Sequence, residues 1–195
     1  MKKKILIGLT GGLASGKSFV LKIFAALGAK TIDSDKIVHN LLKKDKYVIK
    51  RVINFFGRKV LNKSNNICRS RLGGLVFSNP KKLKRLEKII HPVVLEVIRK
   101  EVNKSKKRIN VVDVPLLFEA GWQRFFDYIA LAWCGEELQV KRVMRRNNLS
   151  REQAYKRMKL QMPMEAKIKK ADFIIDTSKT RDAIKKYIKA TIDKL

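Results

Sequence analysis

Residues that stiffen secreted proteins are scarce in this 195-residue chain, which has four prolines and two cysteines, Cys68 and Cys134. Two cysteines do not make a disulfide framework, so a reduced chain is the simpler interpretation. No apolar run approaches the roughly 18 residues that suggest a membrane span. The basic and apolar start imitates a signal peptide, but glycines soon break its apolar run and no small-residue cleavage site follows. We therefore expect a cytoplasmic protein that does not associate with membranes.

Acidic residues are also scarce, with 17 Asp and Glu against 46 Lys and Arg and a formal net charge of +29. Such an excess can attract nucleic acids or small anionic molecules. The lysines are spread along most of the chain, and Asn and Ile are abundant, as an A/T-rich coding sequence would produce. No helix-turn-helix, zinc finger or RNA-binding aromatic signature accompanies the charge. We interpret it mainly as compositional drift that secondarily helps to attract anionic ligands, and we expect no nucleic-acid partner.

The apolar pattern alternates between strands and helices. A buried strand is predicted at 3–10, a helix at 17–27, a short strand at 29–35 and a helix at 36–44. Later strands are predicted at 109–114, 128–134 and 171–178, and later helices at 136–147, 151–162 and 181–195. The middle of the chain is predicted to be helical at 47–57 and 80–102, where Asn79 favours a helix start and Pro92 should kink the helix or begin a new one. The fold class is therefore α/β, with about five parallel strands, helices on both faces, a helical insertion and an arginine-rich flap.

The segment "GGLASGKS" at residues 11–18 matches the phosphate-binding loop G-x-x-x-x-G-K-S/T. Its glycines allow several backbone N–H groups to turn inward, and the helix that follows points its positive end at the same place. Lys17 can reach the outer phosphates of a nucleoside triphosphate, and the Ser18 hydroxyl can ligate Mg²⁺. The buried strand before the loop and the amphipathic helix after it are the context that this motif requires.

Carboxylates follow two of the predicted strands. Asp33 and Asp35 end the second strand, at the edge where open α/β sheets bind ligands. Either can accept the proton of an attacking hydroxyl or hold metal-bound water, and either can simply cap the next helix, a role that Asp35 fits. Asp113 ends the strand "INVVD" and is placed to support Mg²⁺ or to serve as a structural turn residue.

Arginines are concentrated between residues 142 and 157. They are Arg142, Arg145, Arg146, Arg151 and Arg157. Guanidinium groups bind phosphate in a bidentate manner and can stabilise a transferring phosphoryl group, although each of these residues can also lie on a solvated helix face. His91, beside Pro92, is a candidate substrate contact or a packing residue.

Several separate segments resemble one family, dephospho-CoA kinase. In the order of that family they are "IGLTGGLASGKS", "IDSDKIVHNLL", "LEKIIHPVV", "VVDVPLLFEAGW", "QVKRVMRRNNLSREQAYKRMKLQM" and "ADFIIDTS". They extend from residue 5 to about residue 178. The phosphate loop is shared by many nucleotide enzymes, whereas "DVPLLFE" together with the arginine-rich segment is much more selective.

The resemblance implies a P-loop NTPase fold and the last step of coenzyme A synthesis. In that step the γ-phosphoryl group of ATP is transferred to the 3′-hydroxyl of the dephospho-CoA ribose, with Mg²⁺ as cofactor. It implies a single domain over residues 1–195 with three kinds of subregion. These are a nucleotide-binding core at 1–44, 107–139 and 171–195, a helical dephospho-CoA-binding insertion at 45–106, and a lid at 140–170 that closes over ATP. We expect a monomer or a weak homo-oligomer.

The resemblance also implies residue roles. Asp35, as the second acid of the D-x-D pattern, is the expected base, and Lys17, Arg142 and Arg146 complete the catalytic set. The ATP-binding set is Gly11, Gly12, Leu13, Ala14, Ser15, Gly16, Lys17, Ser18, Phe19, Arg142 and Arg146. The substrate-binding set is Asp33, Asp35, His91, Asp113, Leu116 and Arg157, and the metal ligands are Ser18 and Asp113. Gln161 also matches the lid pattern, whereas Arg145 and Arg151 fall where the family varies.

Three positions depart from the family pattern. Phe19 replaces the usual Thr after the loop serine, Ala14 replaces a frequent glycine, and Cys68 stands where Asp is common. The first two affect packing and freedom of the loop, and the third affects contacts on the substrate side. The alternative functions are another small-molecule or nucleoside P-loop kinase and, from a different class, a nucleic-acid-associated NTPase.

Overall fold

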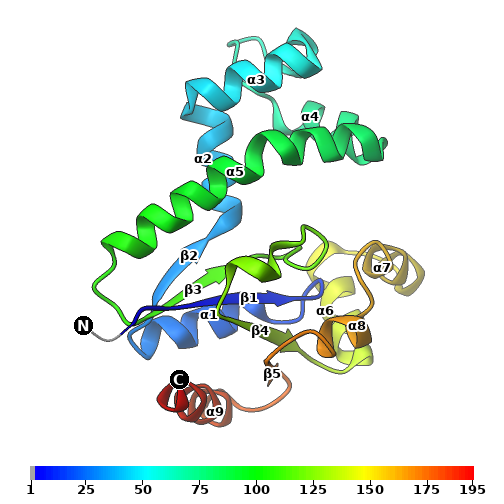
Figure 1. The fold of residues 1–195 in the computed structure, drawn as a ribbon. Coiled ribbons are helices and arrows are strands. Elements are labelled where there is room, and N and C mark those ends of the chain that lie inside the picture. The colour runs from blue at the N-terminus through cyan, green and yellow to red at the C-terminus, as the bar shows by residue number, and fades with distance from the viewer. Residues whose placement is uncertain (1–2) are drawn as a thin grey trace. The chain divides into compact units, whose positions relative to one another are not determined.

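A single parallel sheet forms the centre of the part of the chain that contains β1 to β5 (Figure 1). In a computed structural model that describes residues 3–195, five strands lie in the order β2-β3-β1-β4-β5. Their bounds are β1 Ile5–Gly11, β2 Lys30–Asp33, β3 Ile109–Asp113, β4 Tyr128–Trp133 and β5 Phe173–Asp176. The predicted α/β class and parallel sheet are confirmed, while residues 1 and 2 of the predicted core lie outside the described residues.

The helices follow the predicted alternation with two additions. Their bounds are α1 Lys17–Ala26, α2 Ser34–Lys44, α3 Lys46–Phe56, α4 Arg69–Phe77, α5 Pro80–Lys104, α6 Glu136–Asn147, α7 Arg151–Met158, α8 Met164–Ile168 and α9 Arg181–Lys194, with 3₁₀ turns η1 at Arg58–Val60 and η2 at Trp122–Phe125. The sequence did not predict α4, which contains two adjacent glycines, or α8, a helix of five residues. The predicted helix at 151–162 ends earlier, at Met158. Within residues 3–195, none of the helices is both long and apolar enough to cross a bilayer.

The chain divides into two compact units. Residues up to Asp33 and Lys104–Leu195 form the sheet unit, and Ser34–Asn103 form the helical unit. The insertion was expected at 45–106, but the helical unit begins earlier because α2 packs against α3 and so belongs to this unit.

One face of the sheet is covered by α1 and α9 (Figure 1). Val20 and Phe24 of α1 and Ile188 of α9 are buried in the same apolar cluster as Leu9 and Val111 of the sheet. Removing such side chains from water supplies most of the stabilisation of a layered α/β core. Because β1 pairs with β3 on one side and β4 on the other, the loop that follows β1 is held at its root.

The helical unit is built on α5. Asn79 accepts hydrogen bonds from the N–H groups of Lys81 and Lys82, each 3.1 Å, which confirms the predicted helix start. Pro92 lies inside α5, and the helix runs through it to Lys104, so the alternative of a new helix at this proline is wrong. A proline removes one backbone donor, and the rest of this long helix retains its apolar stripe and continues.

Candidate active site

The phosphate-binding loop joins the end of β1 at Gly11 to the start of α1 at Lys17. Gly16 has a φ of +93°, and a Cβ atom placed on it would lie 3.0 Å from Thr177 Cβ. Glycine is therefore needed at Gly16 both for its backbone conformation and for the close approach of Thr177. Ala14 also has a positive φ, +57°, in a region that favours glycine over alanine by about 1–2 kcal/mol.

A cleft of about 530 Å³ lies over this loop. Its lining consists of Gly12, Ala14, Ser15, Gly16, Lys17, Ser18, Phe19, Arg142, Arg145 and Arg146. The structure thus brings together the loop and two predicted arginines, Arg142 and Arg146, although they are far apart in the sequence. Arg145 falls where the family that the sequence resembles varies, yet it lines the same cleft. The cleft combines backbone N–H groups, an ammonium and guanidinium groups, a chemistry suited to a polyphosphate.

The predicted acids of the sheet lie at the edge next to this cleft. Asp113 ends β3, and its carboxylate is 3.6 Å from the Lys17 ammonium. The two side chains are only 13% and 15% exposed, respectively. Asp33 ends β2 and is the register partner of Asp113. Two adjacent parallel strands therefore deliver carboxylates to one edge, as the positions of these residues in the sequence predicted.

Arg142 is fixed by Thr177, a residue that the sequence analysis missed. Arg142 donates to Thr177 Oγ1 at 3.0 Å and to the Thr177 carbonyl at 2.9 Å. Thr177 Oγ1 in turn donates to the Ser15 carbonyl of the loop at 2.7 Å. The signal that could have identified Thr177 is its position directly after β5, at the same carboxyl edge as the other ligand-binding residues.

The other predicted arginines lie further along the lid segment (residues 140–170). Arg157 is exposed on α7 and is not among the residues that line the cleft. Arg151 pairs with the Glu137 carboxylate of α6 at 2.5 Å, with more than half of each side chain exposed. Arg151 therefore links α6 to α7 and contributes little to stability, as exposed ion pairs generally do.

Three predicted substrate-side residues lie away from the loop in sequence. Asp35 is exposed in the first turn of α2, which begins one residue earlier at Ser34. His91 is half-buried on α5, and burial lowers its pKa, which favours the neutral imidazole. Leu116, after β3, is 46% exposed.

A metal site made by the protein alone is not present among residues 3–195, where no three His, Cys, Asp or Glu side chains group together. Mg²⁺ commonly takes only one or two protein oxygens and completes its shell with phosphates and water. The Ser18 hydroxyl in the loop and the Asp113 carboxylate at the sheet edge are hard oxygen donors of the kind that Mg²⁺ prefers. The residues therefore fit a Mg²⁺ ion that arrives with a nucleotide.

A family model for dephospho-CoA kinase matches residues 5–182. The chain belongs to the dephospho-CoA kinase family. A dephospho-CoA kinase of Carboxydothermus hydrogenoformans is 41% identical over 192 residues, which is 97% of this chain and 93% of that protein.

Two solved structures extend the comparison to the fold of this dephospho-CoA kinase family member. The protein TT1252 of Thermus thermophilus is 31% identical and superimposes with a TM-score of 0.86, covering 100% of this chain and 99% of that one. The dephospho-CoA kinase of Campylobacter jejuni is 32% identical with a TM-score of 0.69, covering 96% and 95%. The predicted family and the P-loop kinase fold are thereby confirmed.

Proposed function

We propose that this kinase transfers the γ-phosphoryl group of ATP to the 3′-hydroxyl of the dephospho-CoA ribose, giving CoA and ADP, the last step of CoA biosynthesis. The observation that supports this most directly is the cleft in which the phosphate loop faces three arginines beside the Lys17–Asp113 pair. This arrangement suits a reaction that depends on positioning and on neutralising charge.

The donor half of the reaction is assigned to the cleft. The loop N–H groups and the N-terminus of α1 bind the triphosphate, and Lys17 binds its outer phosphates. Arg142, Arg145 and Arg146 neutralise charge on the transferring group. Arg142 is pre-positioned for this by its two hydrogen bonds to Thr177, so it loses little conformational freedom when ATP binds.

Ser18 and Asp113 would hold Mg²⁺ in this site. When bound, the ion supplies neutralisation of phosphate charge. Asp113 faces Lys17 in the structure, so its carboxylate also balances the ammonium before substrates bind. Both residues therefore act on charge at the phosphate end of the site.

The acceptor half is assigned to the acids and to three further residues. Asp35 accepts the proton of the ribose 3′-hydroxyl while that oxygen attacks the γ-phosphorus in line. Asp33, at the end of β2 and two positions before Asp35, orients the hydroxyl. His91, Leu116 and Arg157 contribute to binding of dephospho-CoA.

We further propose that the enzyme works in the cytoplasm as a monomer or weak homo-oligomer and has no nucleic-acid partner. Support comes from its two free cysteines and from the small anionic substrates, which suffice as targets of its positive charge.

The test is to incubate the purified protein with Mg-ATP and dephospho-CoA and to identify the product by mass. We expect CoA and ADP in equal amounts, and no CoA when the terminal ribose of the acceptor carries a 3′-deoxy group. Failure to form CoA, together with ATP hydrolysis stimulated by RNA or DNA, would overturn the assignment in favour of a nucleic-acid-associated NTPase.

A further inference from the structure

Both backbone polar groups of Leu13, in the phosphate loop, are held by glutamine side chains. The Leu13 N–H donates to Gln161 Oε1 at 3.0 Å. Gln139 Nε2 donates to the Leu13 carbonyl oxygen at 2.8 Å. Gln139 lies on α6 just before the lid segment, and Gln161 follows α7 within it. The two ends of the arginine-bearing part of the chain therefore converge on one residue of the loop.

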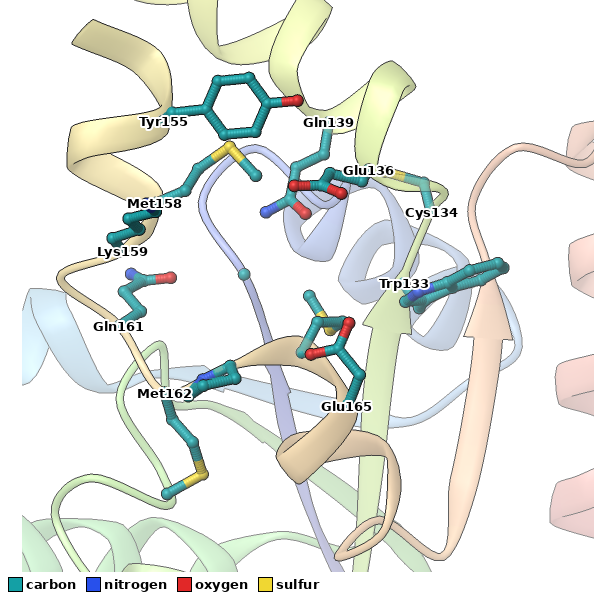
Figure 2. Close-up of a pocket in the computed structure, with 13 residues that line it drawn as sticks. Trp133, Cys134, Glu136, Gln139, Tyr155, Met158, Lys159, Gln161, Met162 and Glu165 are labelled. Atoms are coloured by element: carbon teal, nitrogen blue, oxygen red, sulfur yellow. The ribbon is translucent and has the colours of Figure 1, made fainter. Parts of the chain in front are cut away.

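These glutamines line a second cavity, of about 320 Å³, on the Gly12 side of the loop. Figure 2 shows Gln139 and Gln161 directed into it from their separate segments, together with Tyr155 and Met158 of α7. A Cβ atom on Gly12 would lie 2.5 Å from Gln139 Nε2 and 2.8 Å from Met164 Cε. Gln139 is only 5% exposed, so it has little room to move aside. The loop therefore packs closely against Gln139 and against the part of the lid segment that contains Met164.

The backbone next to Gln161 is also fixed by a hydrogen bond. The N–H of its neighbour Met162 donates to Glu119 Oε1 at 3.0 Å. The same carboxylate oxygen lies 2.8 Å from the Lys167 ammonium, whose side chain is fully buried. Glu119 comes from the segment after β3, so the end of the lid segment is tied to the sheet as well as to the loop.

We propose that Gln139 and Gln161 are positioning residues. By binding the Leu13 backbone, they fix the position of the phosphate loop relative to the lid arginines. Arg142, Arg145 and Arg146 lie on α6 and line the cleft over the phosphate loop. The same loop is held by the two glutamines. Order in the loop is therefore coupled to the placement of the guanidinium groups that meet the triphosphate. The inference rests on the proposed function for the identity of the nucleotide, but it concerns how the site is held and not which acceptor is used.

Variants of equal size test the two hydrogen bonds. Gln161→Met and Gln139→Met retain the side-chain volume and remove the hydrogen-bonding amide. Each is expected to raise the Kd for ATP, measured by calorimetry without acceptor, about tenfold, the effect of one hydrogen bond lost to a partly buried backbone group. The Kd for dephospho-CoA should stay within about twofold, a change smaller than one such hydrogen bond would cause. Gln123→Met, at an exposed glutamine of η2, is the matched control and should match the wild type in both constants.

The direction of each hydrogen bond gives a second test. Gln161→Glu retains an acceptor for the Leu13 N–H, whereas Gln139→Glu presents a carboxylate to a carbonyl oxygen. The same charge enters in both variants, so Gln139→Glu should weaken ATP binding more than Gln161→Glu does.

Wild-type ATP affinity in both methionine variants would overturn the proposal. So would a purely structural effect, in which the melting temperature and the active fraction fall while the Kd for ATP is unchanged. Because ATP binding is measured directly, these outcomes are separate from a failure to form CoA, which would overturn only the proposed acceptor.

Discussion

At the scale of single residues, two neighbouring aspartates occupy different surroundings. Asp33 is partly buried at the end of β2, opposite Asp113 in the sheet register. Asp35 is exposed in the first turn of α2, where a helix N-terminus favours a negative charge. A residue that must meet an incoming hydroxyl needs access, whereas one that shapes the site can be partly covered. This contrast supports Asp35 as the base and Asp33 as its neighbour.

The substitution Asp35→Asn tests that division of roles. It is expected to lower kcat about 100-fold, the usual lower range for loss of a general base, and to leave the KM for ATP nearly unchanged. Steady-state kinetics with both substrates measure both effects. Asp33→Asn is the matched comparison and should mainly raise the KM for dephospho-CoA. A near-normal kcat in Asp35→Asn would remove Asp35 as the base.

The site for the phosphoryl donor could be predicted where it depends on a local sequence pattern. The residues that reach it through long-range contacts could not be predicted. The spacing of Gly11, Gly16 and Lys17 is a property of one short segment, so the loop could be predicted from it alone. Thr177 and Gln139 act on the loop through contacts that span more than a hundred positions. No periodicity in either segment reports such a contact, because it depends on the order of strands in the sheet.

At the scale of elements, the segment after β3 and α8 are joined by the Glu119–Lys167 ion pair. Burial raises the pKa of Glu119, but the Lys167 ammonium and the Met162 N–H favour its ionised form more strongly, so its pKa lies below the usual value. The lower folded-state pKa means that the pair stabilises the fold above the unfolded pKa of about 4.5. That stabilisation is lost as the pH falls through the folded-state value.

The variant Glu119→Gln should therefore lower the free energy of unfolding by about 1–3 kcal/mol at neutral pH. This is below the full cost of breaking a buried pair, because Glu119 is partly exposed. The difference from the wild type should shrink as the pH falls from about 6 to about 3. Urea unfolding across this range measures both effects.

Glu137→Gln, which breaks the exposed pair with Arg151, is the matched control. It should lower the free energy of unfolding much less than Glu119→Gln does, because ions of an exposed pair are already well solvated. A pH-independent difference between Glu119→Gln and the wild type would contradict the role of the Glu119 charge.

Element boundaries show what the sequence could and could not predict at this scale. α1, α6 and α9 have continuous apolar stripes, and their predicted positions agree closely with the structure. α8 is too short for a helical period to be recognised, and its position depends on the burial of Lys167. A lysine is among the residues least expected in a core, so the burial of Lys167 could not be predicted without knowing that Glu119 pairs with it.

At the scale of the whole molecule, a chain with a net charge of +29 acts on two anionic substrates. Oppositely charged ligands are drawn to such a protein over a distance set by ionic strength. We interpret the large number of lysines as compositional drift, and long-range attraction of anions follows from the charge whatever its origin.

Salt should therefore weaken capture of both substrates. Raising the salt concentration from about 0.1 M to about 1 M shortens the screening length from about 10 Å to about 3 Å. We expect kcat/KM for ATP and for dephospho-CoA to fall at least tenfold, mainly through KM. Sucrose at equal osmolality is the control and should have a much smaller effect. A kcat/KM that does not change with salt would show that the excess charge is without influence on capture.

The central place of β1 in the sheet bears on how the chain is made. Ile5 of β1 pairs with Ile109 of β3, and Ile7 pairs with Tyr128 of β4, whereas β2, which is synthesised sooner, lies on the far side of β3. A ribosome that adds about 5–20 residues per second needs on the order of ten seconds to supply the first partner. Throughout that time the apolar segment "ILIGLTG" has no strand of its own chain to pair with natively. This segment, which leads into the phosphate loop, is therefore open to pairing with other nascent chains until β3 has been synthesised.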